Sequence, residues 1–195
     1  PPVSAPERLR VEHLDDAVLG LGTGTPRLSW WLPEGMGAQH GYEIEIDGRP
    51  HGRIVSARNV LVPWPTTAVT SSTRVQWRVR VWTDTGASDW SAFAWFETGL
   101  LEPSDWRAQW IEPPAVEEPP AGERPAWELR ATFTIGEPTG PARLHATAHG
   151  IYECFLNGVR VASANAAGEL VYNSASTAEN SDSNAVVFQS FDISP

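Results

Sequence analysis

The sequence has no lysine, one cysteine and no long apolar run. All 14 basic residues are arginine, against 24 aspartates and glutamates, which gives a formal net charge of -10. A chain this acidic is repelled by phosphate backbones, so we expect no nucleic-acid partner. Cys154 has no second cysteine with which to form an internal disulfide, so the sequence gives no support for a disulfide-stapled scaffold. No stretch approaches the roughly 20 apolar residues of a transmembrane helix, and we expect no membrane span.

What the sequence does contain is a series of short apolar alternations separated by turns rich in Gly, Pro and Asp. No long segment keeps a 3.6-residue period, which favours an all-β fold. A Gly-rich bend is expected at Gly20 to Gly24. The other predicted elements before residue 75 are strands around Leu9 and Val11, Leu28 and Trp30, Tyr42 to Ile46 (closed by Asp47-Gly48), Ile54, Val60 to Val62, and Val69.

The clearest predicted strand covers Val75 to Trp82. Its odd positions present Val, Trp, Val and Val to one face, and its even positions present Gln, Arg, Arg and Trp to the other. A turn at Asp84 to Gly86 leads to a returning strand from Trp90 to Phe96. About seven strands result, the number expected of an immunoglobulin-like or fibronectin type III-like sandwich over residues 1–101.

A Pro- and Glu-rich connector is expected over residues 102–125, because repeated prolines stiffen an extended chain. All ten tryptophans lie at or before Trp127, which also indicates that two different units meet near this connector. Trp106 and Trp110 are expected to pin the two units together.

Residues 126–195 read as a second β unit. Its expected strands are Trp127 to Ile135, Leu144 to Ala148, Ile151 to Leu156, Val159 to Val161, and Val186 to Ile193. Asn157-Gly158 predicts a tight hairpin, since this pair supplies the two positive φ angles of a type I′ turn. The polar stretch Ala162 to Ala185 is expected to be a long loop. About six strands are fewer than the eight of a jelly roll, so we predict an incomplete jelly-roll sandwich.

Motifs that carry catalysis are missing from this sequence. It has no G-x-S-x-G, H-E-x-x-H, paired C-x-x-C or phosphate-binding loop, and Gly20 to Gly24 is better explained as a plain bend. His145 and His149 on one strand would lie about 13 Å apart, too far to share a metal ion. Glu153 is expected to face outward if Cys154 faces inward. We therefore predict no catalytic residue.

Two groups of residues are candidates for binding. Arg78 and Arg80 beside Trp82 and opposite Trp90 predict a stacked arginine–tryptophan ladder, which is interpreted as structural, with sugar stacking as the alternative. Glu179, Asn180 and Asp182, with Asn184 nearby, are the best oxygen-ligand cluster and are candidate calcium ligands. Their spacing matches no defined calcium motif, and a solvated loop is the alternative.

Several segments, in this order along the chain, resemble the N-terminal region of bacterial α-L-rhamnosidases of the glycoside hydrolase family 78 type. They are Pro26 to Trp30, Gln76 to Trp82, Trp90-Ser91, Phe96 to Leu101, Asp105 to Ile111, Ala142 to Leu144, Ala148 to Glu153, Leu156 to Val161, and Phe191 to Ser194. The order of so many segments carries the resemblance more than any one of them.

The resemblance implies an intact enzyme that releases terminal α-L-rhamnose with inversion, using two glutamates in a downstream α/α toroid that this chain lacks. It also implies a galactose-binding-like second module, which in some relatives binds rhamnose with calcium. The expected partners are thus a catalytic domain on the same polypeptide and rhamnose-containing glycans. Family members usually carry Pro-Gly-Trp-Thr and an arginine-bearing strand at this position, and Ala162 to Ala185 has neither.

Two rival functions stay open at this point. One is a stand-alone carbohydrate-binding protein, and the other is a cell-surface adhesion module, which predicts further copies of the first unit. The compartment, bacterial cytoplasm or secreted, also stays open.

Overall fold

The computed structural model describes residues 4–15, 17–114, 120, 127–137, 140–148, 150–161, 173–175 and 189–194. Its strands in the first half are β1 (Glu7–Val11), β2 (Val18–Leu21), β3 (Leu28–Trp31), β4 (Gln39–Ile46), β5 (Arg49–Pro50), β6 (Ile54–Val55), β7 (Arg74–Thr83), β8 (Gly86–Ala87) and β9 (Ala94–Thr98). A 3-10 turn, η1 (Pro103–Asp105), follows. The second half contains β10 (Arg143–Ala146), β11 (Gly150–Tyr152), β12 (Cys154–Leu156), β13 (Val159–Val161), β14 (Asn173–Ala175) and β15 (Gln189–Asp192).

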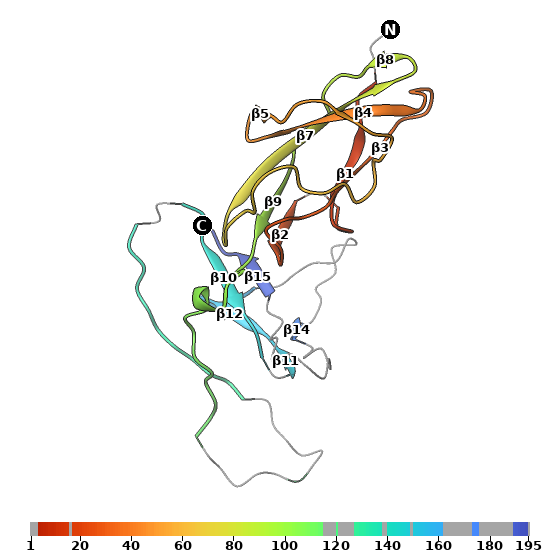
Figure 1. Ribbon diagram of the computed structural model, residues 1–195. Helices are drawn as coiled ribbons and strands as arrows, with labels where there is room; N and C mark the ends of the chain where they lie inside the picture. The colour runs from red at the N-terminus through yellow and green to blue at the C-terminus, as the bar shows by residue number, and fades with distance from the viewer. Residues whose placement is uncertain are drawn as a thin grey trace.

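Strands β1 to β9, called the first unit below, form two facing sheets (Figure 1). The larger sheet has the order β2-β9-β7-β4-β5, with β6 beside β4 and β8 beside β7, and the smaller sheet is the antiparallel pair β1-β3. β2 runs parallel to β9, whereas β4, β7 and β9 pair antiparallel. The all-β, sandwich prediction is confirmed.

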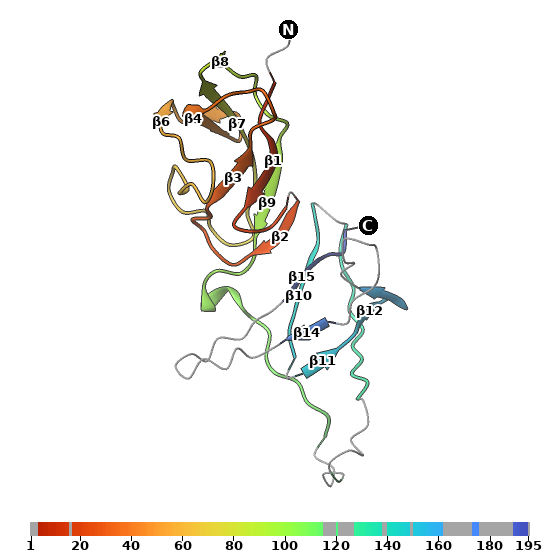
Figure 2. The same ribbon diagram turned by 90° about the vertical axis from the view of Figure 1, so that its right-hand side faces the viewer.

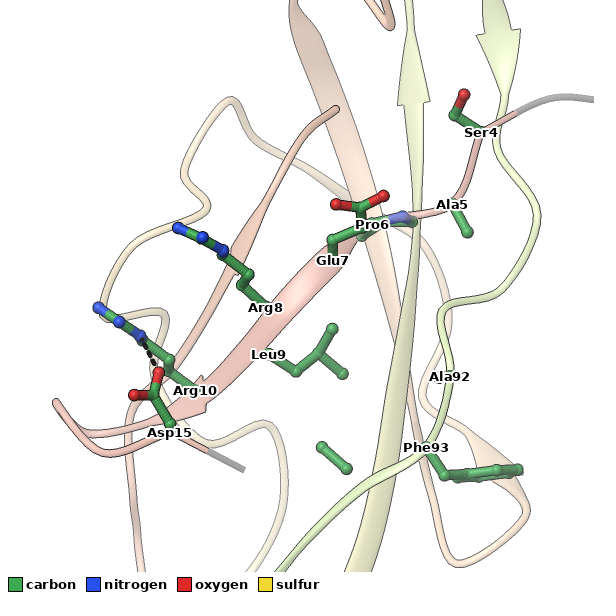
Figure 3. Close-up of a pocket in the computed structure, with 11 residues that line it drawn as sticks. Ser4, Ala5, Pro6, Glu7, Arg8, Leu9, Arg10, Asp15, Ala92 and Phe93 are labelled. Atoms are coloured by element: carbon green, nitrogen blue, oxygen red, sulfur yellow. Dashed lines mark hydrogen bonds and ion pairs between the residues drawn. The ribbon is translucent and has the colours of Figure 1, made fainter. Parts of the chain in front are cut away.

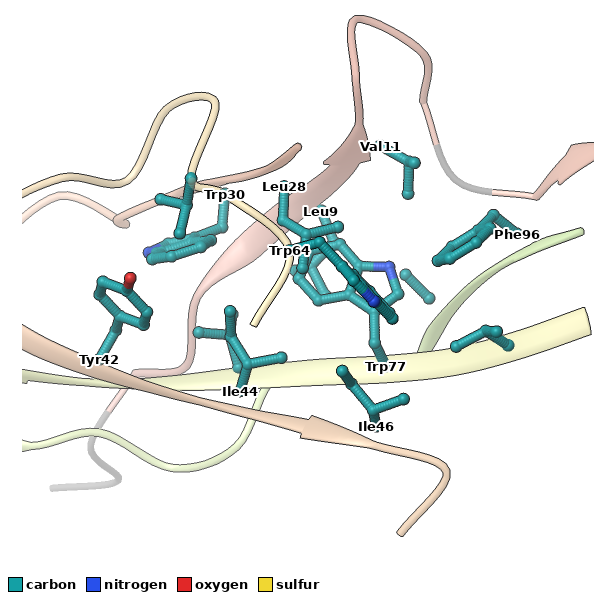
Figure 4. Close-up of a cluster of buried hydrophobic side chains, with 14 of the residues drawn as sticks. Leu9, Val11, Leu28, Trp30, Tyr42, Ile44, Ile46, Trp64, Trp77 and Phe96 are labelled. Atoms are coloured by element: carbon teal, nitrogen blue, oxygen red, sulfur yellow. The ribbon is translucent and has the colours of Figure 1, made fainter. Parts of the chain in front are cut away.

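The core of the first unit lies between these sheets and is dominated by tryptophan (Figure 4). Trp30 meets Tyr42 edge to face at 5.1 Å between ring centroids, and Trp64 meets Phe96 in the same way at 5.5 Å. Such pairs stabilise by about 0.5–1.5 kcal/mol beyond the area they bury. The Trp30 indole also donates to the buried Gln39 side chain at 3.0 Å, which satisfies its polar atom. Three of the ten tryptophans, Trp30, Trp64 and Trp77, thus have a packing role in this core.

Strand β7 has the predicted two-residue alternation. Val75, Trp77, Val79 and Val81 are buried, and the residues between them face the other side. The returning strand is shorter than predicted, since β9 starts only at Ala94. Before it, the Ser88 and Ser91 hydroxyls accept hydrogen bonds from the β7 backbone N–H groups of Val81 and Val79. Side chains there take over a role that a regular ladder would give to backbone carbonyls.

Other predictions in the first unit need correction. Val60 to Val62 is not a strand but a single bridge, in which Val62 and Leu28 exchange backbone hydrogen bonds of 2.8 Å. Val69 contributes one backbone bond, to Gly24. The bend expected from Gly20 begins later, because Gly20 belongs to strand β2. The Asp47-Gly48 turn is confirmed, with positive φ at both residues.

Strands β10 to β15, called the second unit, pair two by two as β10-β15, β11-β14 and β12-β13. The Asn157-Gly158 hairpin joins β12 and β13 with φ angles of 51° and 79°, as predicted. β14 interrupts the loop expected from Ala162 to Ala185, which otherwise falls outside the described residues. The domain bounds 1–101, 102–125 and 126–195, and the jelly-roll form of the last, stay predictions.

The strand predicted from Trp127 to Ile135 is wrong. Residues 127–136 have no strand assignment, and the Trp127, Leu129, Phe133 and Ile135 side chains are each at least half exposed. Alternation makes a strand only where a neighbouring strand completes its hydrogen bonds, and no backbone pairing of this segment occurs within the described part of the chain.

Within the described residues, no helix is long and apolar enough to cross a bilayer.

Candidate functional site

A buried ion pair joins the two units. The guanidinium of Arg143 on β10 donates to both carboxylate oxygens of Glu97 on β9, with Nε–Oε1 2.6 Å and Nη2–Oε2 2.8 Å. Both side chains are less than a tenth exposed. Arg143 Nη1 also donates to Asp192 Oδ1 on β15 at 2.8 Å. The bond to Glu97 raises the pKa of Arg143, so the guanidinium stays charged. Two-point geometry of this kind fixes orientation as well as distance.

Strands β2 and β15 pack closely where the two units meet (Figure 2). Gly20 in β2 has φ +80°, and a Cβ built on it would lie 2.8 Å from the Cβ and Oγ of Ser190 in β15. Only a residue without a side chain permits this approach. The Ser190 hydroxyl in turn lies 2.8 Å from His145 Nδ1. We call Glu97, Arg143, Asp192, Gly20 and Ser190 the junction.

The pinning role expected of Trp106 and Trp110 stays a prediction. Trp110 is 57% exposed and Trp106 is half-buried. The contacts described above instead use a charged residue in each unit and a glycine. Sequence reasoning missed all five junction residues as site residues, and the φ requirement at Gly20 was the only local signal.

The predicted ladder of arginines and aromatic rings is present on the outer face of the large sheet. Trp90 lies between Arg78 and Arg80, at 4.9 and 4.7 Å from ring centroid to guanidinium carbon. The stack continues through Trp82 to Arg53 at one end, and from Arg78 to Phe93 at the other end. The prediction of stacked Arg78, Arg80, Trp82 and Trp90 is confirmed and extended by two residues.

The charged groups of the ladder are already paired with carboxylates. Arg78 donates to both carboxylate oxygens of Glu45 at 2.8 Å, and Arg80 contacts the Glu43 carboxylate at 2.6 Å. These carboxylates come from β4, directly opposite in register. The guanidinium groups already occupy the ring faces on which a sugar would stack. The arrangement favours a stabilising role over sugar stacking.

An open groove of about 780 Å³ runs along β1 (Figure 3). Leu9 lies between the two walls, while Arg8 and Arg10 point away from Phe93 on the far wall. Arg10 forms an ion pair with the exposed Asp15 at 2.7 Å. The polar groups of this groove therefore do not converge on one point, as an active site requires.

Glycosidases need two carboxyl groups held across a scissile bond. Glu153 is exposed, as expected, and binds Arg160 at 2.8 Å.

Within the described ranges, no three His, Cys, Asp or Glu side chains gather as a metal site would require. His149 and the calcium candidates Glu179, Asn180 and Asp182, together with Asn184, fall outside the described residues. The calcium site stays a prediction.

Comparison with known proteins identifies the first unit. Residues 6–102 match the family described as Rha78A-like, N-terminal immunoglobulin domain. Residues 6–102 belong to this family. An α-L-rhamnosidase of Formosa agariphila is 33% identical over 160 residues, covering 72% of this chain and 17% of the relative. The resemblance to the N-terminal region of α-L-rhamnosidases is thereby confirmed.

Solved structures extend the likeness. The α-L-rhamnosidase of Aspergillus terreus matches with a TM-score of 0.61 and 30% identity, over 80% of this chain and 19% of that structure. That of Dictyoglumus thermophilum matches 98% of this chain and 23% of its own, with a TM-score of 0.78. Its 21% identity shows a shared fold alone. The chain thus spans about a fifth or less of the length of most of these rhamnosidases.

Proposed function

We propose that this chain is the non-catalytic front of an α-L-rhamnosidase, acting as a rigid scaffold for a catalytic domain on the same polypeptide. That enzyme would release terminal α-L-rhamnose from glycosides. The buried pair of Arg143 and Glu97 carries the proposal, since it fixes the second unit against the immunoglobulin-like unit. A scaffold must transmit a defined orientation, and interfaces between units move by default unless such contacts hold them.

The same proposal predicts that the chain has no hydrolytic activity. Incubated with p-nitrophenyl α-L-rhamnopyranoside, the 195-residue chain should release no p-nitrophenol above the buffer rate. Release that scales with protein concentration and survives further purification would overturn the non-catalytic assignment.

The scaffold role has its own test in solution scattering. Arg143→Met should raise the radius of gyration and broaden the distribution of interatomic distances, because the two units lose their fixed orientation. Arg10→Met is the matched control, since the ion pair of Arg10 with Asp15 is exposed. Identical scattering from both variants, with folding confirmed by circular dichroism, would show that the pair does not hold the units.

Sugar recognition is the second proposed function. Rhamnose-containing glycans are the expected ligands, and calcium at Glu179, Asn180 and Asp182 is the expected aid to binding. Guanidinium groups already cover the aromatic faces of the ladder, which argues against these faces as the sugar site. The space between the two units is the better candidate.

A further inference from the structure

A groove of about 650 Å³ lies where the two units meet. Leu19 of β2 forms one wall, the β12–β13 hairpin forms another, and β15 with the residues after it forms a third. Ligand sites favour such boundaries, because residues from two elements can converge there on one molecule. The junction stands beside this groove, since Asp192 both lines it and binds Arg143.

The hairpin gives the groove an apolar surface. Val159 lines it and is 71% exposed, and Leu156, Leu19 and Ile193 are partly exposed there. Covering apolar surface stabilises a complex by about 25 cal/mol per Å². An exposed valine at the edge of a groove is therefore a contact point for a partly apolar ligand.

The groove also carries a carboxylate with spare hydrogen-bonding capacity. Asp192 Oδ1 accepts from Arg143 and from the Ser194 backbone N–H at 3.0 Å. The Asp192 side chain is 57% exposed, so a ligand in the groove can reach its carboxylate. The bonds from Ser194 lower the pKa of Asp192, so this acceptor is charged at neutral pH.

Charge limits the class of ligand. A carboxylate or phosphate ligand would meet the like charge of Asp192, while the Arg160 guanidinium in the same groove is already paired with Glu153. A purely apolar ligand would cover charged groups without replacing their hydrogen bonds. A neutral sugar ring avoids both penalties, because its hydroxyls donate and its C–H face is apolar.

We propose that the inter-unit groove, with Asp192 as hydroxyl acceptor and Val159 as apolar contact, binds a neutral glycoside ring. This inference rests on the proposed sugar recognition and locates it. The bound ring would contact both units, through Leu19 on one side and the β12–β13 hairpin on the other.

Titration calorimetry of the whole chain with methyl α-L-rhamnopyranoside and L-rhamnose tests the inference. We expect saturable binding, reduced at least about tenfold by Val159→Glu, a change of about 1.4 kcal/mol in binding free energy. Val55→Glu is the matched control, because Val55 is also an exposed strand valine (82%) but lies outside the groove. It should bind as the unchanged chain does. Sodium glucuronate should not bind.

Several outcomes would overturn the site. They are the absence of heat with either neutral sugar at a concentration tenfold above a Kd of about 1 mM, equal binding by the two valine variants, and tighter binding of glucuronate than of rhamnose. Each would leave the scaffold proposal intact, since that depends on scattering by the Arg143 variant. Unchanged melting of Val159→Glu, followed by circular dichroism, separates loss of binding from loss of folding.

Discussion

Arg143 and Glu97 lie 46 residues apart and form a bidentate ion pair in which each side chain is more than nine-tenths buried. Buried pairs of this kind add little net stability compared with apolar residues of the same shape. Removing one partner, however, leaves the other charge buried and unpaired. The value of the pair is therefore in fixing how two elements meet. Removing one partner of the pair should therefore lower the free energy of unfolding.

Arg143→Met should destabilise the chain by about 3–5 kcal/mol, because the Glu97 carboxylate stays buried without its partner. Urea unfolding followed by circular dichroism measures the change. Adding Glu97→Gln should recover part of the lost unfolding free energy, since the unpaired carboxylate charge is then removed. Arg10→Met should cost no more than about 1 kcal/mol, as exposed pairs do. Equal losses for the two arginines would contradict the burial argument.

Folding stability should fall as the pH drops below about 6.5 through His145. Burial lowers the pKa of His145, with Glu97 opposing this shift and Arg143 adding to it. Because the unfolded chain then binds a proton more readily than the folded chain, stability is present above the unfolded pKa and is lost as the pH falls below it. Unfolding free energies at pH 7.5 and 5.5 should differ less in His145→Gln. His51→Gln, at an exposed residue, should keep the full difference.

Removing the central ring of the ladder should weaken the first unit. Trp90→Ala removes two cation–π contacts, each contributing about 0.5–1 kcal/mol, so we expect a loss of at least about 1–2 kcal/mol in unfolding free energy. Trp90→Phe should keep part of it. Trp127→Ala, at a tryptophan that is 53% exposed, serves as the control and should change little. A larger effect at Trp127 would mean that the exposed segment is covered in solution.

The hairpin turn of the second unit depends on Gly158. At φ +79°, Gly158→Ala should cost about 1–2 kcal/mol, because a side chain is strained in the left-handed region. Gly136→Ala, where φ is not positive and no atom lies within 4 Å of the added Cβ, should be close to neutral. Hydrogen exchange of the β12 and β13 amides measures both. Equal protection in the two variants would contradict the assigned turn.

Calcium should stabilise the chain if Glu179, Asn180 and Asp182 provide its oxygen ligands, because an ion that binds only the folded state shifts unfolding by mass action. We expect a higher melting temperature with millimolar calcium, reversed by a chelator and abolished by Asp182→Asn. Asp89→Asn, at an exposed residue, should leave the calcium response unchanged. A response that survives Asp182→Asn would place the ion elsewhere.

Local patterns were sufficient for some elements of this fold and insufficient for others. The alternation from Val75 to Val81 and the Asn157-Gly158 pair each determine their geometry through neighbouring residues, so β7 and the hairpin could be predicted. The stacking of Arg78 and Arg80 on Trp90 followed from the same strand register. β7 and the hairpin pair with adjacent strands, and Trp90 lies in the short segment between β8 and β9.

The junction could not be predicted in this way. Glu97 lies one residue before the end of β9 and Arg143 begins β10, and nothing near either residue indicates that they meet. Trp127 to Ile135 fails for the opposite reason, since its alternation is strong but its pairing depends on a partner strand that alternation cannot supply. Long-range pairing, not local preference, decides both.

The close approach of Gly20 to Ser190 limits how the two units can be recombined with those of related chains. Exchanging the immunoglobulin-like domain between two relatives would place a new strand against β15, where even a methyl group collides. A working chimera would need to inherit the glycine, the serine and both charged partners as one set. Grafts cut at the connector alone should express as loosely tethered, protease-sensitive modules.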